Sequence, residues 1–446
     1  MKKLLIPLVV LLVVMLSGCP EGTTYINYEK GSYTDTDQDG IPDVAELAGT
    51  SFYGMPLYDW GARPGIRDVF IHVAPMNYTG QDAGMILQKE ALDRIVAAFA
   101  KEGFAVHFDV GRYGLYDEYE SVSSGSYNLS DRDHRVPYAE SISINYSNTA
   151  ATVMGYKNSY FPSERINIFH FLVIGSSQNP DGSGGSSGVA ELPGNDFLVT
   201  LANWNFFFGT GSIGSTDLTR ANIKNWVVNN QAATIMHEFG HNLGLRHGGD
   251  ENQNYKPNYY SIMNYLYQLA GLPKIGTNEG DRYYYERYLN SGSTAEERNS
   301  SVWAVKLTTK TPLDYEDNYF EDTFRMDYSH GNGSDLNEAD LNENTGLGQT
   351  GSGAVDWNGS GGAAESSVVD YDINPTWTTQ ANSYNPPLEP SDAVTANPLE
   401  DHDDWTNLVL YYVSNTQGSS RFYMDDEQTI EAEESLLHMM PEVTRR

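Results

Sequence analysis

Cysteine, positive charge and long apolar segments are all scarce in this chain of 446 residues. A single Cys excludes disulfide bonds within the chain. The 27 Lys and Arg residues are outnumbered by 60 Asp and Glu residues, and the net charge of −33 argues against nucleic acid as a partner, because a polyanion would be repelled. Residues 182–188 are rich in Ser and Gly, but no Walker pattern accompanies them, so they do not indicate a phosphate loop.

The composition is otherwise that of a globular protein. Apolar residues make up 39% of the chain and charged residues 20%, so there is ample material for a core. The length allows one large domain with insertions, or two or three ordinary domains. The acidic excess fits calcium binding, and it also fits plain solubility of an exterior that faces salt.

The first nineteen residues have the pattern of an export signal. Lys2 and Lys3 precede the apolar run Leu4–Leu16, whose thirteen residues are too few to span a bilayer comfortably. The following residues, Leu16–Cys19, resemble a bacterial lipoprotein box. This resemblance implies cleavage before Cys19 and a lipid anchor on that residue, which would hold the protein at a membrane of the cell envelope or surface. The alternative is an ordinary cleaved signal followed by secretion.

The most informative stretch is residues 237–247, with the sequence HEFGHNLGLRH. On a helix, His237 and His241 lie on the same face and can hold one Zn²⁺, while Glu238 can reach a metal-bound water without ligating the metal. Gly244 can end the helix in a left-handed conformation and turn His247 back as the third ligand. Three protein ligands leave the fourth position open, as a catalytic zinc requires. A buried helix that happens to carry histidines is the competing interpretation, but three of the ten His fall in these eleven residues in one register.

These residues resemble the metzincin metallopeptidases, whose signature is HExxHxxGxxH followed by a Met-turn. The second element is present as Ser261–Tyr265, with the sequence SIMNY. The resemblance implies that Met263 forms an apolar floor beneath the zinc. It also suggests that Tyr265 ligates the zinc or stabilises the transition state, as in astacins and serralysins, although Tyr265 is also one of 31 tyrosines. Gly248, after the third His, points to none of the best-known subfamilies.

A second metal site is predicted near the N-terminus, in the twelve-residue loop 35–46 with the sequence DTDQDGIPDVAE. Its acidic residues occupy loop positions 1, 3, 5, 9 and 12, with Gly at 6, which is the pattern of an EF-hand-type calcium loop. The loop also resembles the calcium repeats of thrombospondin type 3. No amphipathic helix precedes it, and an acidic linker is the alternative. The predicted Ca²⁺ ligands are Asp35, Asp37, Asp39, Ile41, Asp43 and Glu46.

The apolar patterns predict an α/β (α+β) fold with a mixed twisted sheet. We expect strands at 67–76, 104–110, 166–174 and 189–201, helices at 84–101 and 222–243, and a helix at 405–413 that closes a smaller, irregular lower subdomain. The strand at 189–201 is expected to be the antiparallel edge strand beside the cleft, although Pro193 would interrupt its pairing. His170, inside an apolar strand, is expected to be a core histidine.

The domain organisation follows from these features. We expect a lipoprotein signal at 1–19, a tether with the calcium loop at 20–60, a metzincin-like domain at 61–413 and an acidic tail at 414–446. Residues 307–401 form an acidic, Asn/Gly-rich insertion, either of calcium-supporting loops or of plain polar chain.

The predicted function is that of a zinc endopeptidase acting on extracellular proteins or peptides, with Glu238 as general base. One alternative is a non-enzymatic, calcium-binding adhesin on a metzincin-like scaffold, although such a protein would not need Glu238. A metal hydrolase acting on smaller amides is the other alternative.

Overall fold

The computed structural model describes most of the residues between 34 and 348 and a short segment near the C-terminus. Side chains are described in residues 34–77, 82–144, 149–204, 223–254, 256–265, 267–269, 271–272, 324–348 and 398–410. Only the backbone is described at 24–26, 220–222, 287–288, 304–305 and 368–369. The predicted signal at 1–19 with Cys19, most of the insertion and the tail at 414–446 lie outside these residues. Within the described part of the chain, no helix has the length and apolar character that crossing a bilayer requires.

A five-stranded mixed sheet forms the centre of the fold, in the order β10-β11-β9-β3-β4. Four strands run parallel, and β10 pairs antiparallel with β11 at one edge. The strands are β3 (Arg67–Pro75), β4 (Phe104–Asp109), β9 (Phe169–Ile174), β10 (Gly188–Ala190) and β11 (Asp196–Val199). The predicted α/β class with a mixed sheet is therefore confirmed.

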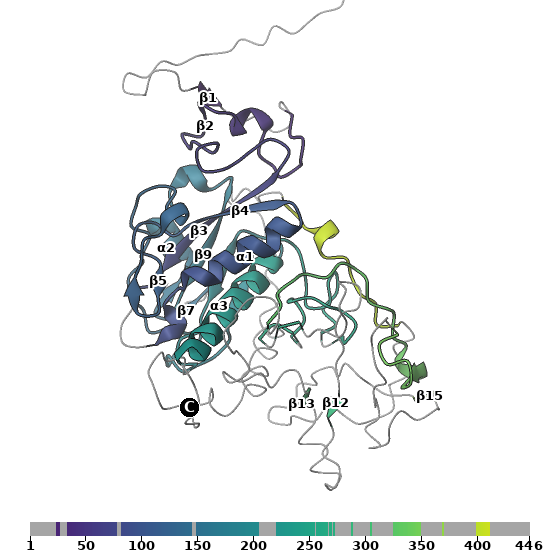
Figure 1. Ribbon diagram of the computed structural model, residues 1–446. Coiled ribbons are helices and arrows are strands. Elements are labelled where there is room, and N and C mark those ends of the chain that lie inside the picture. The colour runs from purple at the N-terminus through teal and green to yellow at the C-terminus, as the bar shows by residue number, and fades with distance from the viewer. Residues whose placement is uncertain are drawn as a thin grey trace, which may run out of the picture.

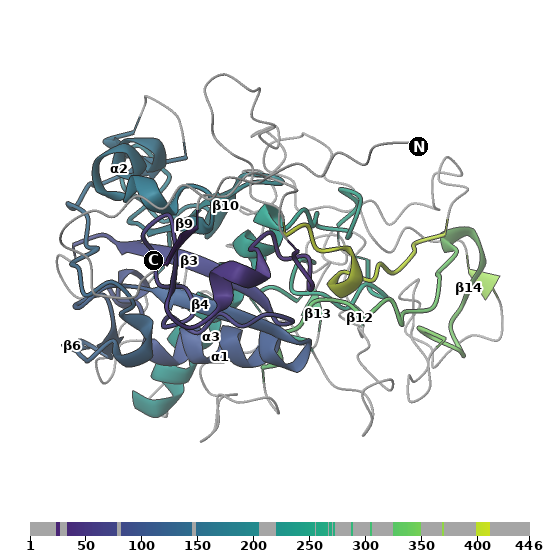
Figure 2. The same cartoon turned by 90° about the horizontal axis from the view of Figure 1, so that it is seen from above.

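Helices cover both faces of this sheet, and Figure 2 shows α1 (Lys89–Lys101) and α3 (Arg220–Asn242) on one side and α2 (Val153–Tyr160) on the other. The larger core joins α1 and α3 to the side chains of Val69, Ile71 and Val73 from β3. On the opposite face, Val153 and Tyr156 of α2 pack with residues of β9 and β11. The connection β3–α1–β4 is the parallel pair with a helical crossover that the apolar periods predict.

Short elements make up the rest of the described chain. Two-residue and three-residue strands pair as β1 (Thr24–Ile26) with β2 (Thr50–Phe52), β5 (Tyr116–Asp117) with β6 (Glu120–Ser121), β7 (Ile142–Ser143) with β8 (Ala151–Thr152), β12 (Arg287–Tyr288) with β13 (Ala304–Val305), and β14 (Leu341–Asn342) with β15 (Val368–Val369). Single 3-10 turns occur at Asp43–Glu46, Ala83–Met85, Gly125–Tyr127, Ser163–Arg165, Glu338–Asp340 and Trp405–Asn407. Beyond α3, the described residues contain only such short elements.

Three predicted elements differ from the structure. The helix expected from residue 84 begins at Lys89, because the 3-10 turn at Ala83–Met85 is followed by extended backbone at Ile86 and at Gln88, the N-cap of α1. The strand expected at 189–201 is two strands, β10 and β11, and Pro193 stands in the turn between them. Of the helix expected at 405–413, the described residues form a single 3-10 turn at Trp405–Asn407 and then chain without regular structure as far as residue 410, and residues 411–413 lie outside the described part.

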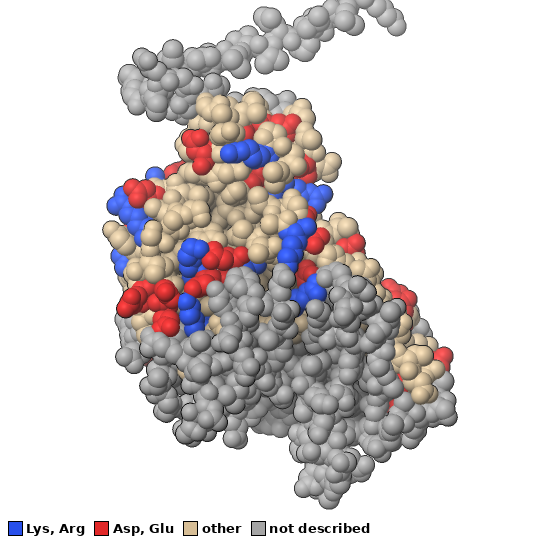
Figure 3. Space-filling model, viewed as in Figure 1, with Lys and Arg blue, Asp and Glu red and all other residues tan. Residues whose placement is uncertain are grey.

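Residues 34–62 pack against the sheet. A separate apolar cluster joins Ile41, Ala45 and Phe52 to Phe70 of β3 and Phe169 of β9. In Figure 1 this segment caps the sheet above β3 and β4. On the described surface seen in Figure 3, acidic and basic side chains are interspersed.

Candidate metal centre

Helix α3 brings the first two histidines together in the core. The Nδ1 atoms of His237 and His241 lie 2.9 Å from the Ile262 carbonyl oxygen and 2.7 Å from that of Leu245. A carbonyl only accepts, so each Nδ1 carries the proton and each Nε2 presents a lone pair. The two Nε2 atoms are 3.2 Å apart. Two lone pairs that face each other at this distance repel unless a cation lies between them.

Gly244 brings His247 to the same point. Its φ of +96° is the left-handed conformation that ends a helix, and the Leu245 N–H donates to the Gly240 carbonyl oxygen across the turn at 2.9 Å. One ring nitrogen from each of the three histidines then lies within 4.8 Å of the others. The Nε2 atom of His247 is buried and has no hydrogen-bond partner among the described residues. The structure thus brings together the three predicted zinc ligands.

Burial keeps these three imidazoles neutral. Removal from water lowers the pKa of His241 to about 4, and it lowers the pKa values of His237 and His247 well below the usual range, with a further contribution from repulsion among the rings. The neutral imidazole is the form that ligates metals. Two nitrogens of a tetrahedral zinc site, each about 2.0 Å from the metal, are about 3.3 Å apart, so the donor set and its spacing fit this ion.

The side chain of Glu238 extends from helix α3 to the first residue of the edge strand. Its side chain is fully buried. A Cβ on Gly188, the first residue of β10, would stand 2.5 Å from Oε1 of Glu238 and 2.6 Å from its Cγ. The edge strand can approach the carboxylate this closely only because residue 188 has no side chain. The sequence analysis missed Gly188, since nothing in a Ser/Gly-rich loop distinguishes one glycine from the next.

The predicted Met-turn lies against the same helix. A Cβ on Gly240, between the two helix histidines, would be 2.3 Å from Sδ of Met263, so the sulfur packs directly under the helix backbone. Tyr265 is 1% exposed, and its ring centroid is 4.3 Å from that of His247 and 5.6 Å from that of His237. Met263 therefore packs against the helix that carries two of the histidines, and Tyr265 lies against two of the histidine rings.

Asn242 is a further positioning residue that the sequence analysis missed. Its Nδ2 donates to the carbonyl oxygens of Glu191 at 2.9 Å and Asp196 at 3.1 Å, and its Oδ1 lies 3.2 Å from Nδ1 of His170. The Gly194 N–H donates to the Asn242 carbonyl oxygen at 3.1 Å. These bonds join the end of α3 to the turn between β10 and β11. His170 is buried in the core as expected, and burial lowers its pKa to about 4.

The segment 398–410 is hydrogen-bonded to the residues that precede the Met-turn. Asp404 accepts hydrogen bonds from the Tyr259 hydroxyl, which is 2.9 Å from each carboxylate oxygen, and from the Ser329 N–H at 3.0 Å. Burial raises the pKa of Asp404 to about 7. The Val409 N–H donates to the Leu243 carbonyl oxygen at 2.8 Å, so this extended chain also supports the end of α3.

The acidic loop forms two groups of carboxylates that share Asp39. One contains Asp35, Asp37 and Asp39, and the other contains Asp39, Glu46 and Asp68. Asp43 belongs to neither group, because its oxygens accept hydrogen bonds from the N–H and hydroxyl of Thr36 at 2.8 Å and 2.6 Å. The Ile41 N–H donates to Asp39 at 2.7 Å. Asp68, from β3, was missed because it lies outside the loop pattern.

No family model, no curated protein and no solved structure matches this chain.

Proposed function

We propose that this protein is a zinc-dependent endopeptidase of the metzincin type. The observation that carries the proposal is the convergence of three buried, neutral imidazoles, two of which have their Nε2 lone pairs facing each other 3.2 Å apart. A structural role in the core would not require three such nitrogens to face a common point. The pattern HExxHxxGxxH and the Met-turn agree with this function.

His237, His241 and His247 would hold the metal. Zinc bound there would supply Lewis-acid chemistry to the scissile carbonyl and to the attacking water. The backbone carbonyls of Ile262 and Leu245 fix the protonation of two of the ligands and orient their rings.

Glu238 is the proposed general base. It follows the first ligand on α3, and its buried carboxylate would take a proton from the attacking water and deliver it to the leaving amine. Tyr265, whose ring stacks on that of His237 and lies tilted against that of His247, is the proposed donor to the developing oxyanion.

The edge strand β10 is the proposed platform for an extended substrate. Among the described strands it pairs only with β11, and a peptide that adds to its other edge would run beside Glu238. Pro193 does not interrupt this edge, because it stands in the turn after β10.

The direct test measures zinc content and hydrolysis of a denatured protein substrate in one preparation. We expect about one zinc per chain, and we expect Glu238→Gln to keep the zinc while hydrolysis falls at least a thousandfold. Glu120→Gln, at an exposed position, is the matched control and should match the parent. A Glu238→Gln protein that retains full activity would refute the assigned base. Absence of hydrolysis by the folded, zinc-loaded parent would favour the adhesin instead.

Export and lipid attachment at Cys19 complete the proposal, and this residue lies outside the described part of the chain. Globomycin-sensitive processing and labelling with a fatty-acid analogue would test it, with Cys19→Ala as the control. An unlabelled, secreted parent would indicate an ordinary signal peptide.

A further inference from the structure

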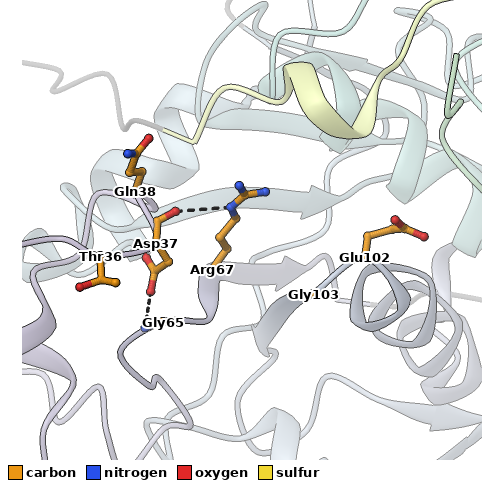
Figure 4. A pocket seen from close by; sticks show the side chains of 7 residues that line it. All are labelled: Thr36, Asp37, Gln38, Gly65, Arg67, Glu102 and Gly103. Atoms are coloured by element: carbon orange, nitrogen blue, oxygen red, sulfur yellow. Dashed lines mark hydrogen bonds between the residues drawn. The ribbon is translucent and has the colours of Figure 1, made fainter.

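The acidic loop is docked on the first residues of β3. Figure 4 shows Asp37 beside Gly65, just before the strand, and Arg67, its first residue. The carboxylate of Asp37 accepts from the Gly65 N–H at 2.7 Å, and its carbonyl oxygen accepts from Nε of Arg67 at 3.4 Å. A polar hollow of about 480 Å³ lies between the loop and the turn at Glu102 and Gly103. The loop and the strand therefore form one unit, and a ligand between them could draw groups from both.

Three buried carboxylates meet beneath this contact. Asp39, Glu46 and Asp68 are 1%, 0% and 0% exposed, and one oxygen from each lies within 4.8 Å of the others. The oxygens of Asp39 each accept a backbone N–H, from Ile41 and Asp68, both at 2.7 Å. Asp68 accepts from the Arg63 N–H at 2.9 Å and is hydrogen-bonded to Nε2 of His107. No described Lys or Arg side chain forms an ion pair with Asp39 or Glu46.

Glu46 is the residue that indicates a ligand. Its side chain is fully buried and directed into the cluster, and no N–H or O–H group of the described residues donates to either of its oxygens. A buried carboxylate without a donor is strongly unfavourable in its charged form, more so beside two others, so the cluster must either bind a cation or retain protons. Hydrogen bonding within the loop does not explain why this side chain is held inside.

We propose that Asp39, Glu46 and Asp68 bind one Ca²⁺ that joins the acidic loop to β3. Calcium takes carboxylate oxygens at about 2.3–2.6 Å, so oxygens on opposite sides of the ion are about 4.8 Å apart. All donors here are oxygens, which suits a hard cation better than zinc. The site differs from a calcium loop that is complete within residues 35–46, because Asp68 comes from the sheet and Asp43 takes no part. It does not depend on the proposed peptidase activity.

Calorimetric titration of the whole processed chain with CaCl₂ tests this site, at constant saturating zinc. We expect Glu46→Gln to abolish one binding event or to weaken it at least tenfold, and Asp68→Asn to do the same. Asp43→Asn is the matched control, since it makes the same change of charge in the same loop, and its affinity should stay within about twofold of the parent. Thermal unfolding with and without CaCl₂ gives a second readout, in which the rise in Tm should be lost only in the first two variants.

Several outcomes would overturn the proposal. A parent that binds no Ca²⁺ would do so, and so would an Asp68→Asn variant with undiminished affinity. Equal weakening by Asp43→Asn and Glu46→Gln would instead indicate a site formed by the loop alone. Glu46→Gln also controls for folding, because without Ca²⁺ the loss of a repelled charge should leave its Tm no lower than that of the parent.

Discussion

A methyl group at position 188 should disable the proposed base while leaving the metal ligands in place. In Gly188→Ala, all three of the nearest atoms to the new Cβ belong to Glu238, at 2.5 Å, 2.6 Å and 2.7 Å. Ordinary contacts between carbon atoms are about 3.5–4.0 Å, so the carboxylate or the strand must retreat by roughly 1 Å. The backbone at Gly188 is not in the left-handed region, so alanine adds no conformational strain there.

Displacement of a catalytic group by about 1 Å costs on the order of a hundredfold in rate. We therefore expect kcat/KM of Gly188→Ala to fall about a hundredfold, which corresponds to roughly 2.7 kcal/mol of lost transition-state stabilisation. The assay is hydrolysis of a quenched fluorescent peptide, with zinc content measured on the same sample. Gly155→Ala, the same substitution in α2 on the other face of the sheet, is the control and should stay within about threefold of the parent.

A double variant shows whether the loss passes through Glu238. If Gly188→Ala acts only by displacing this carboxylate, it should have no further effect in a Glu238→Gln background, because the group it displaces no longer works as a base. An additional large loss in the double variant would contradict this reasoning. So would loss of zinc together with activity in the single variant, since the histidines would then be the groups disturbed.

Two further predictions concern the supports of the site. Because burial raises the pKa of Asp404 from 3.8 to about 7, the folded protein retains a proton that the unfolded chain has lost between these pH values, so stability should fall as pH rises through this window. Between pH 5 and pH 8, the free energy of unfolding, measured in urea, should fall by roughly 2.5 kcal/mol less in Asp404→Asn than in the parent. An equal fall in the two proteins would contradict the raised pKa. Asn242→Ala removes two buried hydrogen bonds to the β10–β11 turn and should destabilise the protein by about 1–3 kcal/mol, whereas Asn252→Ala, on the surface, should be neutral in the same unfolding assay. Unchanged stability of Asn242→Ala would show that the turn is held by other contacts.

The sequence was informative wherever a local pattern determines local geometry. Four-residue spacing on a helix places His237 and His241 together, and a glycine at position 244 is suited to the turn that the structure contains. Apolar runs likewise predicted β3 and β4 to within one residue, and the C-terminal end of α1. These features depend on residues that are close in the sequence, so a sequence pattern can reveal them.

The misses depend on partners that are distant in the chain. The strand expected at 189–201 is split by a turn that contacts the end of α3, where Nδ2 of Asn242 donates to the carbonyl oxygens of Glu191 and Asp196. The segment after Trp405 is extended because the Val409 N–H donates to the Leu243 carbonyl oxygen and not to its own chain. Asp68 is part of β3, and its N–H donates to Asp39 of the acidic loop. None of these contacts produces a periodic pattern in the sequence.

The zinc ligands show how the two kinds of information combine. The motif specifies three imidazoles, but their competence as ligands depends on which nitrogen holds the proton, and that is decided by the carbonyl oxygens of Ile262 and Leu245. Backbone acceptors carry no residue signature, so side chains at these two positions can vary without altering the ligands. What must be preserved is the path of the Met-turn and of the turn at Gly244. The contacts that hold those paths, from Met263 under Gly240 and from Val409 to Leu243, are therefore as necessary to the proposed chemistry as the histidines themselves.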